Sequence, residues 1–125
     1  MEKYDGMMDE HCIRICDKLN TLPGVETIES CEGHGKHAFN VWFDCTDINS
    51  LNFIMFMFSK RYSSYGQNWN VMLADSDNRN PKIMNFLLTS IGNYGHVTLG
   101  EEAYKQIDTF CDEFDKLLQW YNSTK

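Results

Sequence analysis

Apolar residues near the N-terminus recur at spacings of four, three and four, and this pattern predicts a helix. The residues are Met8, Cys12, Ile15 and Leu19. Side chains at such spacings lie on one face of a helix. We expect this helix over residues 5–19. Pro23 and Gly24 then end it, because proline cannot continue the hydrogen-bond ladder and glycine accepts the turn.

Two strands are predicted after this turn. Residues 25–31 are rich in β-branched side chains, and residues 38–45 alternate between apolar and polar positions, as strands with one buried face do. The apolar positions of the second strand are Phe39, Val41, Phe43 and Cys45, and the other face carries Asn40, Trp42 and Asp44. We expect the two strands to form a hairpin.

The second half of the chain repeats the order of helix, strand and strand. Asp47 can cap a helix that runs to about Tyr62, because its carboxylate accepts hydrogen bonds from free backbone N–H groups. Residues 53–58 are so uniformly apolar that a buried strand also fits them. Strands are predicted over residues 69–74 and 83–89.

A final amphipathic helix is predicted from Thr98 onward. Thr98 and Glu101 have the spacing of a capping box, in which each side chain bonds a free backbone N–H at the start of the helix. Apolar residues then alternate spacings of four and three, which is typical of an amphipathic helix. The opposite side is expected to be an acidic outer face. It carries Glu102, Asp108, Asp112 and Asp115.

Together these elements predict one α+β domain over residues 1–125. Their order is α-β-β-α-β-β-α. The packing that suits it is a two-layer sandwich, in which helices cover one face of a mainly antiparallel sheet. A chain of 125 residues can bury a core without metal or disulfide support.

The net charge argues against two classes of partner. The chain has 18 acidic and 11 basic residues, which gives a net charge of −7. This charge repels nucleic acid phosphates and anionic membranes, so we expect neither as a partner. Lys60 and Arg61 lie close to Tyr62, Tyr65 and Trp69, and bases mixed with aromatic residues are found on surfaces that bind single strands, but two bases are too few to overcome the net charge.

The cysteine content suggests a reducing compartment. There are five cysteines, and residues 1–5 are charged, which does not fit a secretory signal. The densest apolar run, residues 51–58, is too short to span a bilayer. We therefore expect reduced thiols and a cytoplasmic location.

Chemically reactive side chains concentrate in the predicted hairpin loop, whose sequence is Ser-Cys-Glu-Gly-His-Gly-Lys-His. Cys31, His34 and His37 form a Cys-x2-His-x2-His pattern, and thiolate and imidazole are ligands that zinc prefers. Three such ligands would leave a fourth position for water, His96 or Cys45. The spacing matches no established zinc signature, and a structural Cys31 with two exposed histidines is the alternative.

A bound metal would give this loop a catalytic role, because it lowers the pKa of bound water toward neutrality. Metal-assisted hydrolysis would then use Glu29 or Glu32 as the proton acceptor. Cys31 with His34 or His37 would instead be a nucleophile–base pair, since a cysteine attacks when a base or a lowered pKa activates it.

The glycines of the loop suggest anion binding as a further chemistry. Gly33 and Gly35 flank His34 and can adopt positive φ, so that successive backbone N–H groups converge on an anion. Lys36 adds positive charge. The loop therefore predicts a site for phosphate or another small anion at these four residues. The alternative is that the glycines only form the hairpin turn.

Two resemblances involve the same segment. Residues 22–37, Leu-Pro-Gly-Val-Glu-Thr-Ile-Glu-Ser-Cys-Glu-Gly-His-Gly-Lys-His, followed by Phe-Asn-Val-Trp-Phe, resemble small uncharacterised bacterial and phage proteins with an L-P-G-V-x-T-x-x-S-C-x-G-H-G pattern. That resemblance implies no activity. Ser30, Cys31, Gly33 and His34 give a fainter likeness to tRNA-wybutosine methyltransferase-like proteins. Those proteins carry arginine at the position of His34, and we do not adopt their activity for this acidic chain.

Three hypotheses follow from the sequence. The leading one is a binding module that recognises a small anion or a divalent metal through residues 31–37, with His96 as a further ligand. The second is a metal-assisted hydrolase that uses the same loop. The third is a protein-interaction or oligomerisation domain, in which Trp42 and its neighbours on an uncovered sheet face bury against a partner or a second copy.

Overall fold

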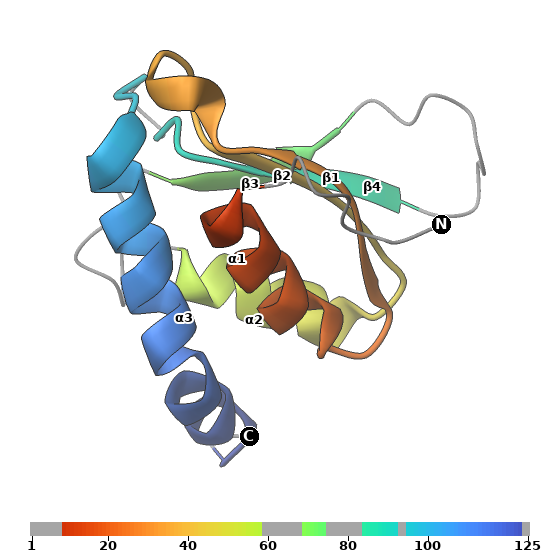
Figure 1. Cartoon of the computed structure of the whole chain (residues 1–125). Coiled ribbons are helices and arrows are strands. Elements are labelled where there is room, and N and C mark those ends of the chain that lie inside the picture. The colour runs from red at the N-terminus through yellow and green to blue at the C-terminus, as the bar shows by residue number, and fades with distance from the viewer. Residues whose placement is uncertain (1–8, 59–68, 75–83, 93–94, 124–125) are drawn as a thin grey trace.

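The structure is a computed structural model that describes residues 9–58, 69–74, 84–92 and 95–123, and it shows an α+β fold (Figure 1). In chain order the elements are α1 (Glu10–Asn20), β1 (Val25–Cys31), the short 3₁₀ helix η1 (Gly33–Gly35), β2 (Asn40–Cys45), α2 (Ile48–Met57), β3 (Asn70–Leu73), β4 (Met84–Thr89) and α3 (Gly100–Ser123). The predicted fold class and the predicted order of helices and strands are confirmed.

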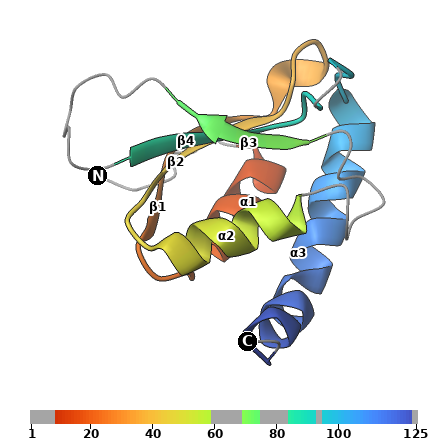
Figure 2. The same ribbon diagram turned by 180° about the vertical axis from the view of Figure 1, so that it is seen from behind.

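The strands form one antiparallel sheet in the order β1-β2-β4-β3. β1 and β2 pair as the predicted hairpin, with Cys31 opposite Asn40 beside the connecting loop. The register shifts between Thr27 and Glu29, as it does where a strand contains an extra residue. The helices α1, α2 and α3 all lie on one face of the sheet, so the fold has the two layers that the sequence predicts (Figures 1 and 2).

The core lies between the sheet and the helical layer. The alternation predicted for β2 is confirmed, because Val41 and Phe43 are fully buried toward the helices and Trp42 lies on the other face, half buried. α3 contributes Phe110, whose ring centroid lies 4.3 Å from that of Phe58. Full burial of such an apolar side chain contributes roughly 1.5–3 kcal/mol.

Ion pairs join the first helix to the last. Arg14 Nη1 lies 3.0 Å from Asp108 Oδ1, and its Nη2 also bonds Asp112. Lys18 Nζ lies 3.4 Å from Asp115 Oδ2. The bond to Asp112 raises the pKa of Arg14 above its ordinary value. The acidic side of α3 that the sequence predicts is therefore partly exposed, but these carboxylates also bind α1, which the periodicity did not indicate.

Of the two predicted helix caps, one is confirmed and one is wrong. Asp47 Oδ1 accepts hydrogen bonds from the backbone N–H groups of Asn49 and Ser50, at 2.9 and 3.1 Å, and so caps α2. Thr98 does not cap α3, because its buried Oγ1 has no hydrogen-bond partner. Its backbone N–H instead donates to Ser90 O, and its carbonyl accepts from Ser90 Oγ. These bonds fix residue 98 to the end of the sheet, and α3 begins two residues later.

Some predictions lie outside the described residues. They are the first turn of the N-terminal helix, the end of the second helix with Lys60 and Arg61, and the first residue of the strand predicted over residues 83–89. Across the part of the chain that the structure describes, no helix has both the length and the apolar character needed to cross a membrane.

Candidate functional site

The loop between β1 and β2 has an unusual backbone. Gly33, His34 and Gly35 follow one another with φ values of 86°, 53° and 77°. Lys36 and His37 both donate their backbone N–H to Gly33 O, at 3.0 and 2.9 Å, which closes the turn. A left-handed conformation costs a residue with a side chain about 1–2 kcal/mol, so the structure holds His34 in place against a local preference.

The two glycines meet different surroundings. A Cβ on Gly33 would lie 2.9 Å from the backbone oxygen of Ala38, whereas a Cβ on Gly35 would meet no atom within 4 Å. Gly33 is therefore required both by its φ angle and by space. Gly35 is required by its φ angle alone and leaves open room beside His34.

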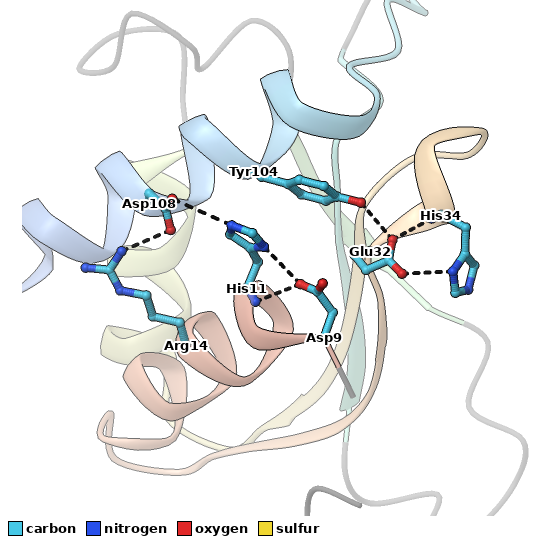
Figure 3. A network of polar contacts seen from close by, with 7 residues as sticks. All are labelled: Asp9, His11, Arg14, Glu32, His34, Tyr104 and Asp108. Carbon is cyan, nitrogen blue, oxygen red and sulfur yellow. Dashed lines mark hydrogen bonds and ion pairs between the residues drawn. The ribbon is translucent and has the colours of Figure 1, made fainter. Parts of the chain in front are cut away.

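Glu32 is the centre of a polar network at this loop (Figure 3). Its side chain is only 13% exposed, and Oε1 lies 2.8 Å from His34 Nδ1. Oε2 accepts the hydroxyl of Tyr104 at 2.8 Å and the backbone N–H of His34 at 2.5 Å. Both carboxylate oxygens are thus engaged, and the negative charge is held in one place.

The contact with Glu32 orients the imidazole of His34. A neutral imidazole carries its proton on one nitrogen, and the bonding partner decides which one. A carboxylate on Nδ1 fixes the proton there, so Nε2 bears the lone pair. The side chain is 76% exposed, which leaves Nε2 accessible to a ligand.

Tyr104 connects this loop to the N-terminus of α1. Its ring stacks on that of His11, with centroids 4.5 Å apart and an interplanar angle of 13°. His11 Nδ1 lies 3.0 Å from Asp9 Oδ1 and its Nε2 lies 3.7 Å from Asp108 Oδ2. Burial, followed by the hydrogen bond to Glu32, raises the pKa of Tyr104 to about 12. Tyr104 therefore remains a protonated donor at neutral pH.

The structure does not bring the predicted zinc ligands together. Cys31 is half buried, and its Sγ accepts the backbone N–H of Gly33 at 3.4 Å. His34 turns to Glu32, while His37 and His96 are exposed. Across the described segments, no group of three or more His, Cys, Asp or Glu side chains is placed to hold a metal ion. Separate local bonds contribute to this, because Cys31 Sγ is held by the backbone N–H of Gly33 and His34 is held by Glu32.

The backbone donors predicted to bind an anion are largely used within the loop itself. The N–H of Gly33 bonds Cys31 Sγ, the N–H of His34 bonds Glu32, and those of Lys36 and His37 bond Gly33 O. These N–H groups are therefore not free to surround an anion, and the one from His34 already bonds the carboxylate of Glu32. Lys36 is exposed and stays available to a ligand.

The other candidates from the sequence have separate roles. Glu29 is exposed on β1, whereas Glu32 orients His34 and is not placed as a free base.

Burial raises the pKa of Cys12 and of Cys111 to about 12, so these thiols stay protonated. Among the cysteines, Cys31 alone is not fully buried.

Sequence reasoning missed Tyr104, His11 and Asp9. Asp9 accepts the backbone N–H of His11 at 2.7 Å, so an aspartate two residues before a histidine at a helix start was an available signal. Tyr104 had no such signal, because it is 72 residues from Glu32 in the chain.

The sheet face opposite the helices carries a row of apolar side chains. Trp42 of β2 pairs across the sheet with Leu87 of β4, which pairs with Met72 of β3. Met72 is 46% exposed. None of the three described helices covers this face (Figure 2).

Comparison with protein-family models, curated proteins and solved structures found no match for the chain.

Proposed function

We propose that this domain is an enzyme in which His34 acts as a general base or nucleophile toward a small-molecule substrate. The observation that carries the proposal is the 2.8 Å contact between His34 Nδ1 and a largely buried Glu32, with the imidazole itself exposed. A carboxylate on Nδ1 fixes the reactive tautomer and stabilises the imidazolium that forms when Nε2 takes a proton or attacks. The reaction class is acyl or phosphoryl transfer, including hydrolysis.

Tyr104 and His11 serve this site as positioning residues. Tyr104 holds the second oxygen of Glu32 at 2.8 Å, which prevents the carboxylate from rotating away from His34. His11 stacks on Tyr104 and is itself held by Asp9. Groups that orient a catalytic side chain in this way raise its effectiveness, because the reactive geometry is formed before the substrate binds.

The proposed site lies in the loop that the sequence indicates, but its reactive group is a histidine and not a bound metal. The proton acceptor is the imidazole of His34, and Glu32 supports it. The backing carboxylate makes a bound metal unnecessary for activating this group. His34 in a left-handed conformation also fits the proposal, because strained residues concentrate at functional sites.

Selective acylation of the histidines tests the proposal. At pH 8, where an ordinary imidazole is neutral, we expect diethyl pyrocarbonate to modify His34 on the order of tenfold faster than His37 or His96. The latter two are matched controls, because both are exposed and neither makes an ion pair with a described residue. Peptide mass spectrometry gives the rate for each histidine.

A variant of Glu32 provides the second arm of this experiment. Glu32→Gln keeps the shape of the side chain and removes its charge, so we expect the rate at His34 to fall to that of His37. Hydrolysis of p-nitrophenyl acetate should fall in parallel in Glu32→Gln and in His34→Asn, and should persist in His37→Asn. Equal rates at His34, His37 and His96 in the wild-type protein would refute the proposal.

Self-association through the open sheet face is a second candidate function. The row of Trp42, Leu87 and Met72 favours it, because an apolar strip across neighbouring strands is suited to burial against a second copy. Sedimentation equilibrium should then show a dimer that Leu87→Glu dissociates. Met55→Glu is the control, since Met55 is also exposed but belongs to α2. A wild-type monomer at high protein concentration would exclude this candidate.

A further inference from the structure

We infer that the group transferred at this site is a phosphoryl group, and that His34 Nε2 carries it as a phosphohistidine. The inference rests on the proposed reactivity of His34 and names the chemical class of its substrate. The donor is an acyl phosphate or a similarly activated phosphoryl compound. Three features of the described structure support it: the local charge, the orientation of the ring, and the free space around it.

Lys36 places a positive charge beside His34 in an acidic molecule. Lys36 stands on the same turn as His34 and is exposed, and the segment that leads into α3 lies beside this turn. Figure 1 shows that segment (cyan) beside η1 (orange), and a Cβ on Gly100 would lie 3.7 Å from Gly35 Cα. We expect the ammonium group of Lys36 to attract the anionic donor to this turn.

The loop favours covalent attachment over simple binding of the anion. Most of its backbone N–H groups are bonded internally, so they cannot surround a free phosphate. A covalent bond to Nε2 is therefore what retains the group.

The chemical step balances with the groups present. The lone pair of Nε2 attacks phosphorus and forms the N–P bond, while the P–O bond to the acyl group breaks and the carboxylate leaves with the electron pair. The ring keeps its proton on Nδ1 and becomes a cation. Glu32, 2.8 Å from Nδ1, balances that charge. Attack on phosphorus by water or an acceptor hydroxyl returns the imidazole to its neutral form.

The approach to Nε2 is sterically open. His34 lies between two residues without side chains, and the position of a Cβ on Gly35 has no atom within 4 Å. A tetrahedral phosphoryl group and its leaving group need such space on the side of the attacking nitrogen.

Labelling with acetyl phosphate at pH 8 tests this inference directly. We expect intact mass spectrometry to show the addition of one phosphoryl group, which is lost in acid, as phosphoramidates are. His34→Asn should abolish the label, and His37→Asn and His96→Asn should retain it. Glu32→Gln should slow labelling on the order of tenfold. Asparagine tolerates the left-handed conformation, so His34→Asn keeps the turn, which circular dichroism verifies.

The outcomes separate the two proposals. If His34 reacts selectively with diethyl pyrocarbonate but acetyl phosphate leaves no label, the phosphoryl inference is wrong and the reactive histidine stands. If a label forms but persists in His34→Asn, the assignment to His34 is wrong. If diethyl pyrocarbonate shows no selectivity, both proposals fail together.

Discussion

Alanine substitutions at the two loop glycines should have clearly different effects on stability. Gly33 and Gly35 share positive φ angles of 86° and 77°, so Gly33→Ala and Gly35→Ala incur the same type of backbone strain. The structure separates them mainly by space, since a Cβ on Gly33 meets Ala38 O at 2.9 Å and a Cβ on Gly35 meets nothing within 4 Å.

The magnitudes follow from these contacts. For Gly35→Ala, a left-handed cost of about 1–2 kcal/mol is offset by about 0.4–1 kcal/mol, because alanine restricts the unfolded chain. The net loss is about 1 kcal/mol. For Gly33→Ala the close contact adds about 1–3 kcal/mol, as in an overpacked site. It also disturbs the two hydrogen bonds to Gly33 O, each contributing about 1 kcal/mol.

Urea denaturation of both variants and the wild type measures the difference. The free energy of unfolding, extrapolated linearly to water, should fall by roughly 3 kcal/mol for Gly33→Ala, combining the strain and contact costs above. Gly35→Ala should lose about a third of that and should keep the selective acylation of His34. Equal losses in the two variants would show that the contact with Ala38 does not restrict the turn, and the account of the loop would be wrong.

Three further predictions concern other parts of the chain. The pKa of Tyr104 is raised from 10 to about 12, so the folded state holds this proton more tightly than the unfolded chain. The resulting contribution to stability is complete below pH 10 and is lost as the pH rises toward 12. Glu32→Gln should lower the pKa of Tyr104, which tyrosinate absorbance measures with Tyr104→Phe as the reference. Cys31 should react rapidly with Ellman's reagent in the native protein while the buried thiols react only after unfolding, and rapid reaction in Cys31→Ser would contradict this. Phe110→Ala should reduce the free energy of unfolding by about 3–5 kcal/mol, because the side chain is fully buried, and a loss below 1 kcal/mol would contradict its place in the core.

The fold was predictable because its elements follow local periodicity. The alternation around Val41 and Phe43 identifies both the strand and its buried face, and Asp47 marks the start of α2 because a cap acts within one turn. The capping box failed for the opposite reason. Thr98 has the right spacing, but Ser90, from another part of the sheet, binds its backbone, and no local pattern contains that contact.

The candidate site was predictable only in part. The loop around His34 was identified because its residue types are uncommon together. The arrangement of its side chains depends on three consecutive positive φ angles and on Tyr104 of α3. Tyr104 reaches Glu32 through a tertiary contact that sequence spacing does not reveal. Sequence spacing therefore left an anion site and a metal site open, and the predicted zinc ligands do not come together among the described residues.

The distance along the chain between Glu32 and Tyr104 has a consequence for synthesis. A ribosome releases the hairpin and its histidine loop well before α3, which supplies the hydroxyl that fixes Glu32. A nascent or proteolytically shortened chain without α3 contains His34 but not the bond that aligns its carboxylate. We therefore expect the proposed reactivity of His34 to be complete only when α3 has folded against the hairpin.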